Sequence, residues 1–133
     1  MKPEQLRFAK THEWVYAEPN EKNERIATIG VSSFAVEALT DLVFMQLPEV
    51  GRAVKTGESI GEIESVKAVS DLYSPVSGKV SAVNTELTNH LETLSADPYG
   101  AGWMVKVQLD DPSQLDSLMD YATYQAQAAE EGH

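Results

Sequence analysis

Residues 62–71 read EIESVKAVSD, and this stretch decides how the chain is expected to fold. Lys67 lies between two runs of β-forming residues, 59–64 and 68–73, and turns that contain glycine or proline bound both runs. Short runs with this punctuation are typical of a compact β-barrel or sandwich. If the two runs pair as a hairpin, Lys67 lies at or beside its tip.

The pattern of short strands continues on both sides of this stretch. Further strands are predicted at 12–17, 25–29, 42–47, 79–84 and 103–109, with a short helix at 32–39, a helical turn or two near 86–94 and a C-terminal helix from 112. Ser32 or Ser33 would cap the first helix and Asp111 the last. The apolar faces of these elements predict a core that contains Trp103, Val105, Val107, Leu109, Val43, Met45, Val80 and Ile63.

The sequence therefore predicts a mainly β fold, a flattened barrel or sandwich of two small antiparallel sheets with a short internal helix and a C-terminal helix. No linker or change in composition divides the 133 residues. A single domain is expected over residues 1–133, with its core at about 6–124 and a frayed tail at 125–133.

Composition and charge exclude several function classes. Ten Lys and Arg against 21 Asp and Glu give a net charge of −11, which does not suit a nucleic-acid binder or a protein that adheres to an anionic membrane. The absence of cysteine excludes disulfides, thiolate catalysis and cysteine metal sites. Without a signal-like or membrane-spanning stretch, a cytoplasmic protein of bacterial type is expected, and a mature organellar protein would look the same.

No residue pattern indicates an active site. The sequence contains no nucleophile elbow and no phosphate-binding glycine loop, and His12, His90 and His133 are not paired at the spacing of metal ligands. The pair Asp110-Asp111 is explained by helix capping. Independent catalysis and a metal site are therefore not expected.

Lys67 has two readings at this point. An ammonium group on a protruding turn is a good handle for a modifying enzyme, since acylation removes its charge and extends the side chain. Alternatively, it is an ordinary surface lysine balanced by Glu62, Glu64 and Asp71. Spacing alone favours the ordinary reading.

Several motifs together carry a family resemblance. They are ESVKA at 64–68 followed by Ser70-Asp71, SPVSGKV at 74–80, HEWV at 12–15, ATIG at 27–30, LPEVG at 47–51 and DPYG at 97–100 with Gly102-Trp103. In order and spacing they resemble the H proteins of the glycine cleavage system over about residues 6–124. Biotinyl carriers are similar but flank their lysine with methionines, and the lipoyl domains of 2-oxoacid dehydrogenases are shorter.

The resemblance implies a lipoyl- or biotinyl-domain-like hybrid fold and a carrier rather than an enzyme. Lipoate would be attached covalently to Lys67, in a hairpin context of Glu64, Ser65, Val66 and Ala68. Thr11, Glu13 and Asp71 match the family's contacts to the aminomethyl-bearing arm. Protein thiols near such an arm could exchange with it, so the lack of cysteine is consistent with this reading.

The resemblance also implies the partners of the carrier. It would receive an aminomethyl group from the pyridoxal-phosphate-dependent glycine decarboxylase and deliver it to the tetrahydrofolate-dependent aminomethyltransferase. Dihydrolipoyl dehydrogenase, with FAD, would reoxidise its dithiol, and lipoate-attaching enzymes would load it. The protein is expected to be a monomer, and its acidic charge could steer it toward basic patches on these enzymes.

The sequence departs from the family pattern at 91–95, which reads LETLS in place of a stretch with proline and asparagine, and at Gly30-Val31-Ser32. The first departure favours a more helical conformation. Two other functions stay open: a lipoate-relay carrier of the same fold that takes no part in glycine breakdown, and an unmodified interaction module.

Overall fold

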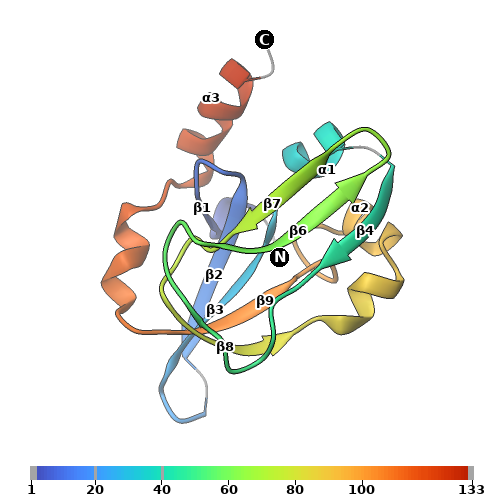
Figure 1. Cartoon of the computed structure of the whole chain (residues 1–133). Helices are drawn as coiled ribbons and strands as arrows, with labels where there is room; N and C mark the ends of the chain where they lie inside the picture. Colours follow the sequence, from blue (N-terminus) through green and yellow to red (C-terminus); the bar gives the residue numbers. More distant parts are fainter. Residues whose placement is uncertain (1–2, 20, 40, 132–133) are drawn as a thin grey trace.

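The computed structural model describes residues 3–19, 21–39 and 41–131, which form two antiparallel sheets and several short helices (Figure 1). The six-stranded sheet has the order β1-β2-β3-β9-β8-β5 and the three-stranded sheet the order β4-β6-β7. The strands are β1 (Arg7–Phe8), β2 (Glu13–Pro19), β3 (Arg25–Val31), β4 (Leu42–Gln46), β5 (Ala53–Val54), β6 (Ser59–Ser65), β7 (Val69–Tyr73), β8 (Gly78–Val83) and β9 (Val105–Leu109). The expected sandwich of two antiparallel sheets is confirmed.

Short helices connect and flank the strands. They are η1 (Pro3–Gln5), α1 (Ser33–Leu39), η2 (Thr85–Asn89), α2 (Glu92–Ala96), η3 (Pro112–Ser117) and α3 (Tyr121–Glu131). The two predicted caps are present, since the amide of Ala35 donates to Ser32 Oγ at 3.2 Å and the amide of Ser113 donates to Asp111 Oδ1 at 3.0 Å. The divergent stretch at 91–95 is helical, as its sequence suggested.

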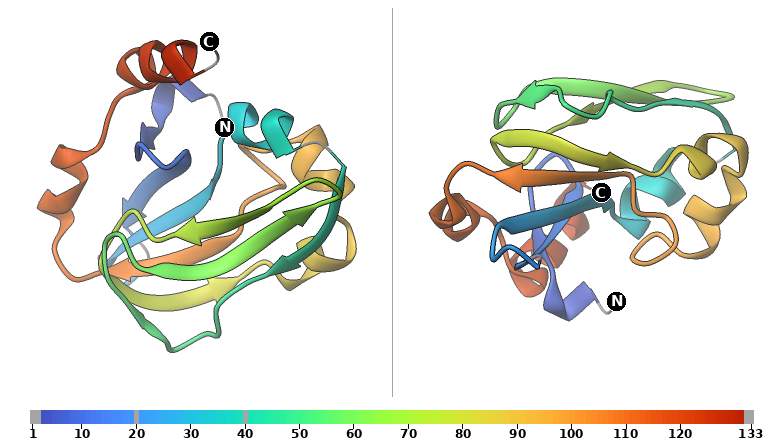
Figure 2. Two further views of the ribbon diagram at one scale, coloured as in Figure 1. Left: turned by 45° about the horizontal axis from the view of Figure 1, so that its top comes forward. Right: turned by 90° about the horizontal axis from the view of Figure 1, so that it is seen from below.

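The main core lies between the two sheets, which stack as layers in Figure 2. Side chains alternate between the faces of a strand, so neighbouring residues of β2 enter different clusters. Val15 joins the main core, whereas Trp14 joins a second cluster with Leu6, Phe8, Tyr124 and Ala128. This second cluster fixes α3 and the N-terminal segment against the far face of the larger sheet.

Two core assignments were wrong. Val43 is 55% exposed. The register of β4 is irregular between Leu42 and Phe44, so the side chain of Val43 does not face the core. Trp103 is only partly buried and packs against the second cluster, while its neighbour Met104, which was not among the expected core residues, is fully buried. The reason is that β9 begins at Val105, so the strand alternation does not extend back to these two residues.

The C-terminal helix was also predicted incorrectly. Instead of one helix from residue 112, the chain forms η3, then an extended bridge between Met119 and Phe8, and then α3. Paired backbone hydrogen bonds of 2.7 and 2.8 Å across that bridge interrupt the helix. The segment expected to fray from residue 125 is helical to Glu131, and residues 132–133 of that expected tail lie outside the described residues.

Two very short strands, β1 and β5, had no counterpart in the sequence analysis. Each has two residues, which is too short to show a period of two. No helix in the described part of the chain has the length and apolar character that crossing a membrane requires.

Candidate functional site

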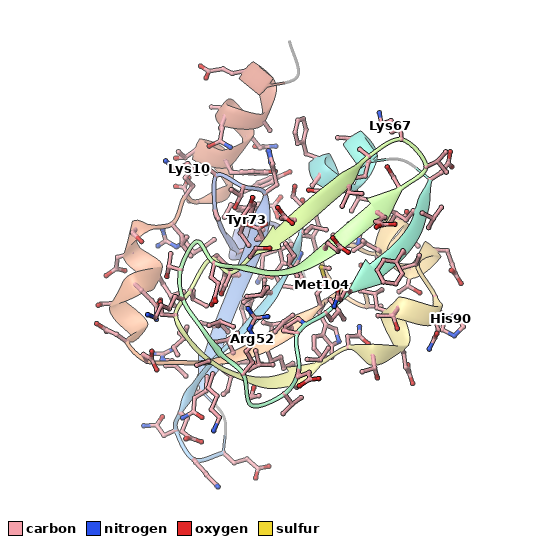
Figure 3. All side chains as sticks on the ribbon, viewed as in Figure 1. Lys10, Arg52, Lys67, Tyr73, His90 and Met104 are labelled. Carbon is pink, nitrogen blue, oxygen red and sulfur yellow. The ribbon has the colours of Figure 1, made fainter. Side chains whose placement is uncertain are left out.

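Lys67 lies in the loop of the β6–β7 hairpin, at the exposed end of the smaller sheet (Figure 3). The strands pair Glu62 with Asp71 and Glu64 with Val69, so the loop contains residues 66–68. The sequence expectation that Lys67 lies at a hairpin tip is therefore matched by the structure.

Ser65 closes the loop beneath Lys67. Its amide donates to the carbonyl oxygen of Ala68 at 2.8 Å, and its hydroxyl donates to the same oxygen at 3.2 Å and accepts from the amide of Ala68 at 3.1 Å. The amide of Val66 donates to the carbonyl oxygen of Asp41 at 3.0 Å, which ties the loop to the segment before β4. The lysine is thus presented by a backbone held on both sides.

Glu13 is a buried carboxyl at the start of β2, only 1% exposed. It accepts hydrogen bonds from the hydroxyl of Thr11 and, at 3.4 Å, from the backbone amide of Tyr73 at the end of β7. Burial is the largest influence on this group and raises the pKa of Glu13 from 4.5 to about 7, against the opposing hydrogen bonds from Thr11 and from the backbone amides of Tyr73 and of Glu13 itself. The site thus contains a carboxyl that changes charge near neutral pH.

Tyr73 connects Glu13 with Asp71, and it was not predicted from the sequence. Its amide contacts Glu13, and its hydroxyl donates to Asp71 Oδ2 at 3.3 Å. The negative charge of Asp71 raises the pKa of the Tyr73 hydroxyl. A spacing of two residues on a strand places Asp71 and Tyr73 on one face, and this signal could have identified Tyr73.

The turn before Glu13 has an unusual backbone conformation. His12 has φ of 81°, a value uncommon for residues other than glycine. Its ring nitrogen Nδ1 lies 2.7 Å from the hydroxyl of Tyr124, which in turn lies 2.5 Å from the hydroxyl of the buried Ser32. The amide of Ser32 donates to the carbonyl oxygen of His12 at 2.9 Å. Helix α3 and the segment before α1 therefore hold the turn that places Thr11 and Glu13.

A groove of about 630 Å³ lies beside this turn and the end of β7. Thr11 and Tyr73 line it, whereas Glu13 lies behind Thr11 and Asp71 lies farther along β7. The remaining walls are Phe8, Ala9, Lys10, Thr56, Gly57, Ser74, Pro75, Ser117, Leu118, Met119 and Gln127. The groove thus combines apolar walls with several polar side chains, a mixture that suits an apolar chain ending in a polar group.

The structure brings three of the four predicted groups together. Thr11 contacts Glu13 directly, and Tyr73 links Glu13 to Asp71. Lys67 lies four residues before Asp71, a separation of about 13 Å along an extended strand. A modification long enough to span this distance is needed to connect the lysine with the groove. Among the described residues, no group of His, Asp or Glu side chains is arranged to hold a metal ion.

Comparisons with known proteins point to one family. The family model described as glycine cleavage H-protein matches residues 6–131. A glycine cleavage system H protein from Rhodopirellula baltica is 53% identical over 98% of this chain and 97% of its own length, and one from Symbiobacterium thermophilum is 48% identical over 93% of each. The crystal structure of such a protein from Mycobacterium marinum superposes with a TM-score of 0.83 at 41% identity, covering 99% of this chain and 100% of that one.

Proposed function

The chain belongs to the glycine cleavage H-protein family, and from this premise we propose that Lys67 is the residue that carries its lipoyl group. The family makes the chain a lipoyl carrier component of the glycine cleavage system rather than an enzyme. The observation that supports Lys67 is its exposed position in a closed hairpin loop, which a modifying enzyme can reach without unfolding the sheet.

The residues of the groove fit such an arm. Apolar walls such as Phe8, Pro75 and Leu118 suit its hydrocarbon chain, and Thr11 and Tyr73 provide polar groups in the same groove. When bound, lipoate supplies a disulfide that accepts an aminomethyl group together with two electrons and is later regenerated by oxidation of its dithiol. The walls of the groove would exclude water from the labile aminomethyl group.

Glu13 and Asp71 would supply the negative charge that holds a protonated amine on the arm. A cation near the buried Glu13 favours its ionised form and therefore lowers its pKa from about 7. Loading would thus convert Glu13 from a partly protonated to an ionised group at neutral pH. Thr11 would orient the Glu13 carboxylate by donating its hydroxyl hydrogen.

We further propose that this carrier delivers the aminomethyl group from glycine decarboxylase to the tetrahydrofolate-dependent aminomethyltransferase, and that dihydrolipoyl dehydrogenase reoxidises its dithiol. The family name supports the system, and the exposed hairpin supports visits to several enzymes. Repeated short visits are favoured by charge complementarity, for which the net charge of −11 is suited.

Intact mass and fragment mapping of the protein from lipoylating cells test the attachment site. One lipoyl increment on Lys67 is expected. Lys67→Arg keeps the charge and should abolish the increment, whereas Lys79→Arg, on the exposed side of β8, should retain it. An unmodified Lys67 beside other lipoylated proteins, or an increment on another lysine, would contradict the proposal.

A glycine–bicarbonate exchange assay with purified glycine decarboxylase tests the pathway. The lipoylated protein should support exchange, and Lys67→Arg should not. Lipoylated protein that fails to support exchange would instead indicate a carrier that relays lipoate to other enzymes.

A further inference from the structure

Exposed apolar side chains gather around the end of the smaller sheet that presents Lys67. Among the described residues, five large apolar side chains are exposed, and four of them lie here: Val43, Phe44, Val66 and Val69, at 55%, 46%, 74% and 60%. The fifth, Val50, is 64% exposed and lies between β4 and β5. Such a concentration beside one functional residue is typical of an interaction site.

Strand register places two of these side chains, Phe44 and Val69, on one face. Phe44, Glu64 and Val69 pair in one row across β4, β6 and β7, and residues in register share a face of the sheet. The opposite face contributes Met45, Ile63 and other residues to the core, so this row lies on the outer face. The irregular register of β4 adds Val43 to the exposed side chains. The apolar side chains on this outer face therefore have no role in the core.

Carboxylates run through the middle of this face. Glu62 and Glu64 lie two residues apart on β6, and Asp71 pairs with Glu62 in the row next to Phe44 and Val69. In the row nearest Lys67, Glu64 therefore lies between the apolar side chains of Phe44 and Val69, and in the next row Glu62 lies between Gln46 and Asp71. A complementary surface has cationic side chains flanked by apolar ones.

We infer that this outer face of β4, β6 and β7 is the docking surface for the ATP-dependent enzyme that acylates Lys67, through basic and apolar side chains on that enzyme. The inference rests on the proposed attachment at Lys67. In the reaction, Lys67 Nζ attacks the carbonyl carbon of a lipoyl adenylate and forms the amide C–N bond. The C–O bond to phosphate breaks, AMP leaves with the electron pair, and the amine proton passes to solvent.

The distance from the reacting atom to the protein backbone distinguishes this enzyme from those that act on the loaded arm. Before acylation, Nζ lies within about 6 Å of its own Cα, as four methylene groups allow. The acylating enzyme must therefore contact residues next to Lys67, including Val66 and the row that contains Glu64 and Val69. Enzymes that act on the distal end of the arm operate farther from this row.

The test measures the acylation rate of unmodified protein by a purified ATP-dependent lipoate ligase with lipoate and ATP, followed by intact mass. Phe44→Thr and Val69→Thr keep residues suited to strands and remove apolar contact area. We expect kcat/KM to fall about tenfold for Phe44→Thr, the size typical of truncating an aromatic residue at an interface. Val50→Thr, the matched control with similar exposure away from the hairpin, should leave the rate unchanged.

A second readout tests the charge pattern. Raising the salt concentration should lower kcat/KM for the unchanged protein, and Glu62→Gln should reduce this salt dependence. Glycine–bicarbonate exchange by Phe44→Thr protein that is already lipoylated should remain unchanged. Urea unfolding should show equal stability for the Thr variants, because exposed side chains contribute little.

Equal acylation rates for Phe44→Thr, Val69→Thr and the unchanged protein would overturn the docking surface. If lipoylated Phe44→Thr protein lost as much activity in the glycine–bicarbonate exchange assay as in acylation, the proposal would also be overturned. The face would then belong to the enzymes that act on the loaded arm. A dimer in sedimentation that Phe44→Thr dissociates would assign it to a second copy of the chain. Failure of the unchanged protein to be acylated would instead refute the proposed function, so the two failures are distinguishable.

Discussion

Glu13→Gln replaces a buried carboxyl, whose pKa burial raises to about 7, by a neutral group of nearly the same shape. The introduced amide can reproduce the hydrogen bonds of the protonated acid. Its oxygen accepts from the amide of Tyr73, and its NH₂ group donates to the hydroxyl of Thr11, which can also act as an acceptor. The substitution therefore removes the cost of ionising a buried group and keeps its contacts.

The magnitude follows from the two pKa values. The unfolded chain loses the Glu13 proton near pH 4.5 and the folded protein near pH 7, so the folded state binds the extra proton between them. The contribution of Glu13 to stability is greatest below pH 4.5, falls as the pH rises to about 7 and is constant above that. The difference between 4.5 and about 7 corresponds to about 3 kcal/mol.

Urea unfolding of both proteins, followed by tryptophan fluorescence between pH 4 and pH 8.5, measures this effect. At pH 4 the two should have similar free energies of unfolding, and at pH 8 the Glu13→Gln variant should be more stable by about 3 kcal/mol. Glu18→Gln, an exposed position on the same strand, is the control and should show no such trend. A difference between wild type and Glu13→Gln that stays constant across this pH range would show that the pKa of Glu13 is not raised by folding.

Three further substitutions test local features. Ser65→Ala should cost about 1 kcal/mol and accelerate amide exchange at Ala68, because the hydroxyl bonds that close the loop are lost; unchanged exchange would contradict this. Gly30→Ala would place Cβ 2.6 Å from the indole of Trp14, so thermal unfolding should show a loss of about 1–3 kcal/mol, and an unshifted midpoint would count against the close packing. Tyr124→Phe removes a buried hydroxyl with two partners and should cost about 1–2 kcal/mol in urea unfolding, whereas a neutral effect would mean those bonds do not stabilise α3.

Features set by neighbouring residues could be predicted from the sequence. The hairpin that presents Lys67 follows from two strand-forming runs separated by a short loop, and both helix caps follow from side chains close to the amides they bind. The alternation of Val105, Val107 and Leu109 likewise identified buried positions of β9. These signals are local, so they do not depend on how distant segments meet.

Errors arose where distant segments decide the outcome. The predicted C-terminal helix is interrupted because Met119 pairs with Phe8, more than a hundred residues away in the sequence. Val43 was assigned to the core because the register shift of β4 against β6 is invisible in a run of apolar residues. The spacing of two residues from Asp71 pointed to Tyr73, but its contact with Glu13 joins two sheets and could not be predicted from the sequence.

The amino-acid sequence was enough to place a lysine in a hairpin loop of a small β-sandwich, and its motifs indicated the carrier family, because periodicity, turns and motifs are properties of adjacent residues. The burial of Glu13, its contact with Tyr73 and the groove beside Thr11 arise from how distant segments pack together. These depend on the packing of β2 against β7 and α3, and burial is what raises the pKa of Glu13 toward neutrality.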